Sequence, residues 1–255
     1  MRHRSGALKK ASRGTPSAPP GKAVPRAFAD DPHLVLLSRP TSPVAERYRR
    51  VRLNLEQGTP EFPFKPQVTV ITSAVPGEGK TTTAANLGLA FAEDTSQPTL
   101  LVDADLRRPS LSRSIVPAPG MGLAEVLAGR MRLDDALISM SDSHLKVLPA
   151  GAPTEYPLEL LHSSLFGGLI AELRQRFARI VIDTPPTVPF TDAAVIAAHA
   201  DATLLVVRAG TTTAPLIRRA RESLSGANFL GALLNDVVHN AVDRYYYGYE
   251  GYATA

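Results

Sequence analysis

The sequence contains no cysteine among its 255 residues. This absence excludes disulfide bonds, thiolate metal ligands and cysteine nucleophiles, and it is compatible with a reducing compartment. No stretch reaches the ~18 consecutive apolar residues that a membrane-spanning helix needs, and the N-terminal segment lacks the apolar core of a secretion signal. We therefore expect a cytoplasmic protein that is built on one globular domain.

Acidic residues are absent from the first 29 positions, which hold seven Lys or Arg side chains. The formal net charge of +4 comes from this segment, because the remaining residues carry 21 basic and 24 acidic side chains. This distribution gives no reason to expect nucleic-acid binding. The segment is also rich in Pro, Ser, Gly and Ala, so residues 1–38 are predicted to form a disordered basic leader. Contact with anionic lipid headgroups is an alternative role for it.

Short apolar runs alternate with helical segments through the rest of the chain. The expected strands are 67–73, 99–105, 145–151, 178–184, 202–210 and 229–236. The expected helices are 80–94, 122–137, 162–177 and 191–200. Apolar strands that alternate with helices indicate an α/β fold, with a mostly parallel sheet and helices on both faces. We expect this domain to span 39–240 and a separate tail to span 241–255.

The segment SAVPGEGKTTT follows the first strand of the expected domain. It fits the phosphate-loop pattern of P-loop NTPases in a relaxed form, with Ala74 in place of a glycine. Gly77 and Gly79 allow backbone N–H groups to surround an anion, and the next helix directs its positive end there. Lys80 is expected to contact the β- and γ-phosphates of ATP, and Thr81 to bind Mg²⁺. The predicted nucleotide-binding residues are Pro76, Gly77, Glu78, Gly79, Lys80, Thr81 and Thr82.

Two acidic motifs end expected strands, at the edge where a parallel sheet binds its ligands. LLVDAD contains Asp103 and Asp105, which can face the same side of an extended segment because they are two residues apart. IVIDTPP contains Asp183, for which a role as a turn cap is the alternative. Carboxylates beside a phosphate loop predict a Mg²⁺ site, because Mg²⁺ prefers hard oxygen ligands. Arg208 and Asn235 are candidates for adenine recognition.

The segment SPVAERYRRVRLNLEQG predicts a helix over residues 43–57. Ser42 is its expected N-cap, Pro43 its first residue, and Gly58 the residue just past its end. The expected apolar stripe consists of Val44, Tyr48, Val51 and Leu55. Another side carries Glu46, Arg49 and Arg52 at intervals of three. A solvated charged face is the simplest interpretation of these three residues.

The C-terminal segment DRYYYGYEGYATA holds five of the seven tyrosines in the chain. They are Tyr245, Tyr246, Tyr247, Tyr249 and Tyr252. An adhesive segment that binds partners through aromatic contacts is one interpretation of this cluster.

The phosphate loop, DADLRRP, VIDTPP and the tyrosine-rich end together resemble the bacterial tyrosine kinase (BY-kinase) family, over about residues 40–252. The resemblance implies a protein tyrosine autokinase that uses ATP and Mg²⁺. It implies that Lys80, Asp103 and Asp105 are catalytic, with Asp103 as the base toward a tyrosine hydroxyl. It also implies that Thr81, Asp105 and Asp183 hold Mg²⁺, and that the five clustered tyrosines are the phosphoacceptors.

The same resemblance implies partners and a location. Glu46, Arg49 and Arg52 match the spacing with which BY-kinases pack into a homo-oligomeric ring, in which one subunit offers its tail to the next. A separate membrane-embedded activator, a tyrosine phosphatase and further protein substrates are also implied. The chain would act at the inner face of the plasma membrane, in polysaccharide polymerisation or export.

The main alternative is a partitioning-type P-loop ATPase, which shares the fold. The phosphate loop of that class carries an extra lysine at the position of Val75. Its absence favours the kinase.

Overall fold

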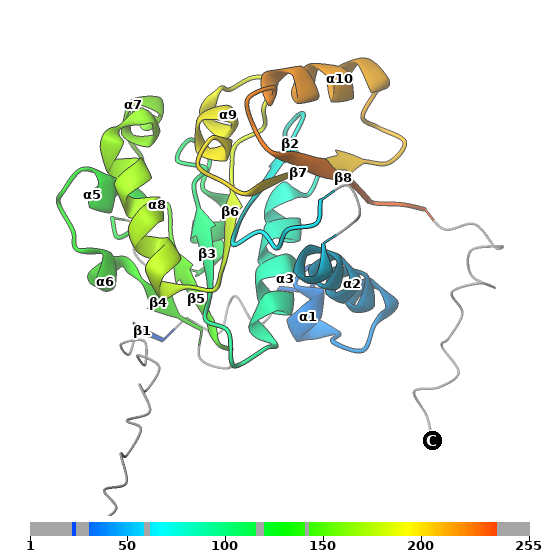
Figure 1. Cartoon of the computed structure of the whole chain (residues 1–255), viewed down its shortest axis with the longest axis horizontal. Helices are drawn as coiled ribbons and strands as arrows, with labels where there is room; N and C mark the ends of the chain where they lie inside the picture. Colours follow the sequence, from blue (N-terminus) through cyan, green and yellow to red (C-terminus); the bar gives the residue numbers. More distant parts are fainter. Residues whose placement is uncertain (1–21, 24–30, 59–61, 116–119, 141–142, 239–255) are drawn as a thin grey trace, which may run out of the picture.

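The computed structural model describes residues 22–23, 31–58, 62–115, 120–140 and 143–238. Within this part of the chain, an eight-stranded sheet runs in the order β1-β4-β5-β3-β6-β2-β7-β8 (Figure 1). Its strands are β1 (Lys22–Ala23), β2 (Val68–Ser73), β3 (Thr99–Asp103), β4 (Ile138–Ser139), β5 (Leu145–Leu148), β6 (Arg179–Asp183), β7 (Ala202–Arg208) and β8 (Phe229–Asn235). In the described residues all neighbouring strands are parallel except β4 and β5.

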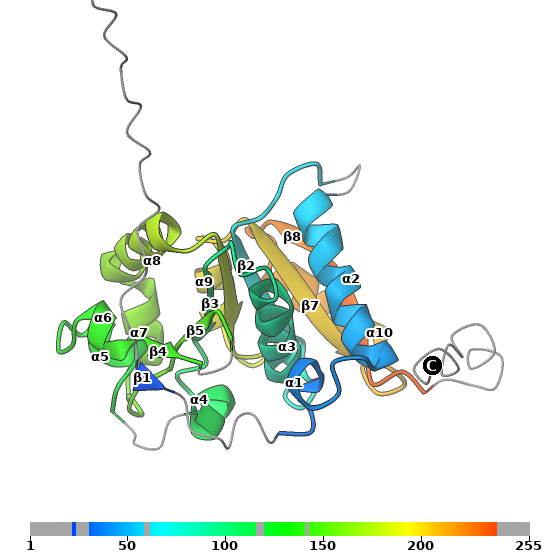
Figure 2. The ribbon, with the colours of Figure 1, turned by 90° about the horizontal axis from the view of Figure 1, so that it is seen from below.

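Helices cover both faces of the sheet (Figures 1 and 2). One face carries α1 (Val35–Ser38), α2 (Pro43–Gln57), α3 (Lys80–Ala92) and the short α4 (Ser110–Ile115). The other face carries α5 (Leu123–Leu127), α6 (Leu133–Ala136), α7 (Pro157–His162), α8 (Ser164–Arg176), α9 (Asp192–Ala197) and α10 (Ala214–Ser223). The predicted α/β fold, with a mostly parallel sheet between helical layers, is therefore confirmed.

Successive strand residues pack into cores on opposite faces of the sheet. Val70 of β2 and Ile182 of β6 pack in the core beneath α7, α8 and α9. Ile71 and Val181 pack in the core beneath α3. Side chains on both faces of the central strands β2, β3 and β6 are buried, which explains their nearly continuous apolar runs.

Two of the expected helices are divided in the structure. The segment 122–137 forms α5 and α6, and Gly129 lies between them with a φ of 68°. The segment 162–177 is divided between the end of α7 and α8 at Ser163, whose backbone is extended. The short strands β1 and β4 were not predicted.

The prediction that residues 1–38 form a disordered leader is wrong at the C-terminal end of that segment. Residues 35–38 form α1, and Leu34, Val35 and Leu36 are at most 7% exposed. Asn86 of α3 donates a hydrogen bond to the carbonyl oxygen of His33 at 2.9 Å. Three consecutive apolar residues bury enough area to offset the entropy of ordering the segment. Residues 1–21 and 24–30 lie outside the described part.

Helix α2 begins and ends at the predicted residues. The hydroxyl of Ser42 accepts a hydrogen bond from the backbone N–H of Ala45 at 3.2 Å, and Gly58 follows the helix with a φ of 74°. The predicted apolar stripe is wrong at Val44, which is 46% exposed, while Ala45 is fully buried. The other members of the stripe, Tyr48, Val51 and Leu55, do pack against the core.

Two residues of the predicted subunit interface bind the C-terminal end of α3 in the same chain. Arg49 donates to a carboxylate oxygen of Glu93 at 2.6 Å and also contacts Glu46. Arg52 donates to the carbonyl oxygen of Ala90 at 2.7 Å. These contacts attach α2 to α3, and a role between subunits stays a prediction. In the described residues, none of the helices has the length and apolar character that crossing a bilayer requires.

Candidate active site

The predicted phosphate loop connects β2 to α3. Gly77 and Gly79 have φ values of 84° and 91°, a region that a β-carbon disfavours. At Gly79, an added β-carbon would lie only 2.1 Å from Nδ2 of Asn235. Glycine is therefore needed at both positions, as the loop pattern predicts.

The side chain of Glu78 supports this loop from inside. Its carboxylate accepts hydrogen bonds from the backbone N–H of Val75 at 2.8 Å and from the hydroxyl of Thr212. The side-chain amide of Asn235 donates to the backbone carbonyl of Glu78 at 2.9 Å. Glu78 is only 2% exposed. Its carboxylate therefore supports the loop from inside, and Glu78 is not among the residues that line the pocket.

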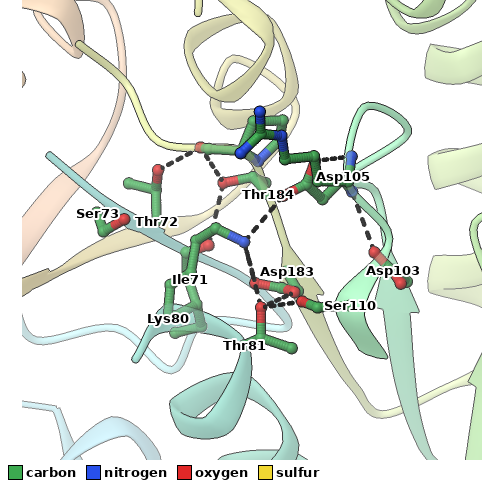
Figure 3. Close-up of polar contacts among 12 residues, drawn as sticks. Ile71, Thr72, Ser73, Lys80, Thr81, Asp103, Asp105, Ser110, Asp183 and Thr184 are labelled. Carbon is green, nitrogen blue, oxygen red and sulfur yellow. Dashed lines mark hydrogen bonds and ion pairs between the residues drawn. The ribbon is translucent and has the colours of Figure 1, made fainter. Parts of the chain in front are cut away.

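Lys80, Thr81, Asp105 and Asp183 come together at the carboxyl ends of the strands (Figure 3). The Nζ atom of Lys80 lies 3.0 Å from Oδ2 of Asp105 and 3.6 Å from Oδ1 of Asp183. The hydroxyl of Thr81 donates to Oδ2 of Asp183 at 2.7 Å. Lys80 and Thr81 begin α3, Asp105 follows β3, and Asp183 ends β6, so the sheet assembles the group that the sequence motifs predicted.

Burial and neighbouring charges compete in this group. Burial raises the pKa of Asp183 to about 6, although the charge of Lys80 acts in the opposite direction. Burial alone would lower the pKa of Lys80, but the charges of Asp183 and Asp105 outweigh it and raise the pKa. The Lys80 ammonium group therefore stays charged at neutral pH.

The donor set fits Mg²⁺. Oδ1 of Asp183 is a buried oxygen without a hydrogen-bond partner among the described residues. The other oxygen of this carboxylate, Oδ2, accepts the hydrogen bond from the Thr81 hydroxyl, and the Asp105 carboxylate contacts the same Lys80 ammonium group as Oδ1 does. Carboxylate and hydroxyl oxygens are hard donors of the kind that Mg²⁺ prefers. Within the described ranges, no three His, Cys, Asp or Glu side chains are placed to hold a metal on their own. Mg²⁺ ordinarily completes its shell with phosphate oxygens and water.

Asp103 lies at the edge of this group, where it contacts the backbone of Asp105 (Figure 3). It is fully buried, and Oδ2 accepts hydrogen bonds from the backbone N–H of Ser112 at 2.8 Å and from its hydroxyl at 2.6 Å. Burial, together with the charge of Asp183, raises the pKa of Asp103 to about 7. The predicted role of Asp103 as a base toward tyrosine requires a different side-chain arrangement from the one described. Asp105, by contrast, lines the pocket.

A pocket of about 710 Å³ opens in front of the phosphate loop. One side is formed by loop and α3 residues, namely Val75, Pro76, Gly77, Gly79, Lys80, Thr81 and Thr82. The other side is formed by the β3–α4 and β6–α9 connections, namely Asp105, Arg107, Arg108, Ser110, Pro186, Val188, Pro189 and Phe190. The predicted nucleotide-binding residues thus line the pocket, apart from Glu78.

Several supporting residues were not found by sequence reasoning. The hydroxyl of Ser110 lies 3.1 Å from that of Thr81, and Arg107 pairs with the buried Asp192 at 3.1 Å. No spacing in the sequence marks these contacts, although Arg107 belongs to the quoted DADLRRP motif. The adenine candidate Asn235 supports the phosphate loop, and the other candidate, Arg208, pairs with Asp236 at 2.7 Å.

Comparison with known proteins adds independent information. Residues 67–214 match the family model described as AAA domain. The chain is 34% identical over 219 residues to the tyrosine-protein kinase YwqD of Bacillus subtilis (strain 168), which covers 85% of this chain and 91% of that protein. It is also 34% identical over 216 residues to the succinoglycan biosynthesis transport protein ExoP of Rhizobium meliloti (strain 1021). That match covers 83% of this chain but 27% of ExoP.

A solved structure is similar throughout the domain. The kinase domain of the Escherichia coli tyrosine kinase ETK matches with a TM-score of 0.74 and 29% identity, covering 82% of this chain and 81% of that chain.

Proposed function

This chain belongs to the bacterial tyrosine kinase family, and we propose that it transfers the γ-phosphoryl group of ATP to tyrosines of its own C-terminal segment. The observation that carries the proposal is the group of Lys80, Thr81, Asp105 and Asp183 at the pocket. A charged lysine, a hydroxyl and two carboxylates are the side chains that phosphoryl transfer requires.

Each side chain of the group has a distinct proposed role. The Lys80 ammonium and the backbone N–H groups of residues 76–82 bind the phosphates. Thr81 and Asp183 hold Mg²⁺ together with Asp105. Oδ1 of Asp183, which has no hydrogen-bond partner among the described residues, supports this assignment. When bound, Mg²⁺ neutralises charge that accumulates on the phosphates.

The reaction forms one bond and breaks another. The phenolic oxygen of tyrosine bonds to the γ-phosphorus, the bond from that phosphorus to the β,γ-bridging oxygen breaks, and ADP leaves. We assign the phenolic proton to Asp105, because that carboxylate lines the pocket whereas Asp103 is fully buried. Asp103 then acts as a positioning residue, since its Oδ1 accepts a hydrogen bond from the backbone N–H of Asp105 at 3.2 Å.

The proposed acceptors are Tyr245, Tyr246, Tyr247, Tyr249 and Tyr252, which lie outside the described residues. Their support is sequence: five of the seven tyrosines in the chain fall within this segment. The other two, Tyr48 and Tyr156, lie in the described domain, where Tyr48 packs against the core and Tyr156 is 62% exposed. Tyr156 therefore provides an internal control for specificity.

Assembly and partners complete the proposal. Glu46, Arg49 and Arg52 form a contact between copies in a ring that presents each tail to a neighbouring pocket. A separate membrane-embedded protein activates the chain at the inner face of the plasma membrane, a tyrosine phosphatase reverses the reaction, and further protein substrates exist. The alignment with only part of ExoP, whose name refers to transport of a polysaccharide, supports a role in polysaccharide polymerisation or export.

The test is residue-level mapping of phosphate after the purified chain is incubated with ATP and Mg²⁺. We expect phosphate only within residues 243–252, and none in a variant with all five clustered tyrosines changed to Phe. The matched Tyr156→Phe variant should be labelled like the wild type. Equal labelling of the five-Phe variant would reject the tail as acceptor, and ATP hydrolysis without any phosphotyrosine would favour the partitioning-type ATPase.

A further inference from the structure

The pocket extends beyond the space that the phosphate loop faces. Its far side includes an apolar surface formed by Pro186, Val188, Pro189 and Phe190, which we name the acceptor wall. Val188 and Phe190 are half-buried and Pro189 is exposed. Phosphate groups bind through charges and hydrogen bonds, which an apolar surface does not supply. This side of the pocket therefore fits a different chemical group.

Hydrogen bonds fix the acceptor wall relative to the phosphate loop. The backbone N–H of Thr187 donates to the carbonyl oxygen of Ser73 at 2.8 Å, and that of Val188 donates to the carbonyl oxygen of Ala74 at 3.1 Å. Ser73 ends β2 and Ala74 begins the loop, so the wall is attached where the loop starts. The separation between the phosphate site and the wall is thereby set by the backbone.

Arg107 fixes the other end of the wall. Its guanidinium lies 4.6 Å from the centre of the Phe190 ring, and its Nε donates to both carboxylate oxygens of Asp192 at 3.1 Å. Asp192 is fully buried, so this pair is anchored in the domain rather than at its surface. The Phe190 ring is held in place before any ligand arrives, which lowers the entropic cost of binding an aromatic group.

Arg108 supplies a positive charge beside the wall. Its side chain is exposed and forms no ion pair with any described residue, whereas Lys80 is already matched by Asp105 and Asp183. The backbone N–H of Arg108 donates to Oδ1 of Asp105 at 2.9 Å, which fixes this residue next to the reacting group. An acidic peptide approaching the carboxylates of the site needs such a cation, because like charges repel at short range.

We propose that the acceptor wall binds the aromatic ring of the acceptor tyrosine and that Arg108 binds an acidic residue directly after it. This inference rests on the proposed kinase function and names the substrate segment that the site selects. The occupant is Tyr249 with Glu250, from another copy of this chain. Of the five clustered tyrosines, Tyr249 is the one that an acidic residue follows directly.

The test is a charge exchange between enzyme and peptide. The enzyme is the full chain with its five clustered tyrosines changed to Phe, so that only added peptide accepts phosphate. The substrates are peptides of residues 243–255 in which Tyr249 is the single tyrosine, with and without Glu250→Lys. Arg108→Glu should raise the KM for the Glu250 peptide about tenfold, because an attraction becomes a repulsion. The same variant should bind the Glu250→Lys peptide more tightly than the Glu250 peptide.

Two further variants separate the possible causes of a change in KM, namely the loss of a ring contact, a charge change at the pocket and a charge change elsewhere on the surface. Phe190→Leu keeps an apolar side chain but removes the ring, and it should raise the KM for both peptides about threefold. Arg218→Glu makes the same charge change on the exposed face of α10, away from the pocket, and should leave both KM values within about twofold.

The outcomes distinguish this inference from the function on which it rests. Peptide phosphorylation with no change in KM for Arg108→Glu, and no preference for the exchanged peptide, would overturn the inference and leave the kinase function intact. The peptide KM values could also stay unchanged while the sedimentation of Arg108→Glu changes in the presence of ATP. That result would show that the acceptor wall is a contact between copies of the chain, and it would overturn the inference too. No phosphate on the wild-type tail or on either peptide would reject the function, and the inference with it.

Discussion

Removing the carboxylate of Glu78 should weaken ATP binding without removing a group that touches ATP. In Glu78→Ala, the backbone N–H of Val75 and the hydroxyl of Thr212 both lose their acceptor. A buried donor that loses its partner costs about 1–3 kcal/mol, and Thr212 is half-buried, so water replaces part of its loss. The expected total is about 2–4 kcal/mol, shared between folding stability and loop order.

We expect the loop to lose its order in the free variant, so that part of the free energy of ATP binding is used to order it again. If about 2 kcal/mol of the total falls on binding, the Kd for ATP rises about thirtyfold. Isothermal titration calorimetry with a non-hydrolysable ATP analogue measures this change, and thermal unfolding measures the remainder.

Glu78→Gln is the matched control. Its amide oxygen can accept from Val75 and its amide nitrogen can donate to the Thr212 hydroxyl, which is both a donor and an acceptor. The Kd for ATP should therefore stay within about threefold of the wild type. Wild-type affinity in Glu78→Ala would show that the carboxylate does not order the loop, and equal losses in both variants would show that its charge matters rather than its hydrogen bonds.

Three further changes test other parts of the account. Alanine at Glu46, Arg49 and Arg52 should give monomers in light scattering. Glu93→Gln weakens only the contacts between α2 and α3, so this variant should stay oligomeric. If both variants dissociate into monomers, assembly depends on the placement of α2 rather than on a direct contact between subunits. The pKa of Asp103 is raised to about 7, so the folded state binds a proton that the unfolded state has released, and stability falls as pH rises from about 4 to 7. In Asp103→Asn the difference in urea-unfolding free energy between pH 5 and pH 8 should shrink, and an unchanged difference would contradict the burial argument. Burial would raise the pKa of Asp201, but hydrogen bonds from Arg174 outweigh it and lower the pKa. The ionised carboxylate therefore stabilises the fold above its ordinary pKa, and this stabilisation is lost as pH falls through the lowered pKa. Asp201→Asn should lower the free energy of unfolding by about 1 kcal/mol at pH 7 and by less at pH 3.

Local sequence patterns predicted the features that depend only on residues near one another in the chain. The ends of α2 followed from Ser42, Pro43 and Gly58, because capping is decided within one turn of the helix. The phosphate loop followed from its glycines, whose positive φ values the structure confirms. Alternating apolar strands and helices were sufficient for the fold class.

Contacts between distant residues were not predictable in this way. Glu78 meets Thr212 across 134 positions, and the sequence around each residue carries no sign of the other. The two-residue spacing of Asp103 and Asp105 placed both acids on one side, yet Ser112 of α4 draws Asp103 into the interior. The contact between Arg49 and Glu93 was not predicted either, because 44 positions separate the two residues.

The most direct test of kinase function compares Lys80→Met with Lys65→Met in the purified full chain. Lys80 is the buried lysine of the pocket and Lys65 is an exposed lysine outside it, so both variants lose one charge but only the first loses it at the phosphates. With γ-labelled ATP and Mg²⁺, Lys80→Met should form phosphotyrosine at least about a hundredfold more slowly, at unchanged circular dichroism. Lys65→Met should match the wild type. Phosphotyrosine formation by Lys80→Met at the wild-type rate would contradict the assignment of this pocket as the kinase site.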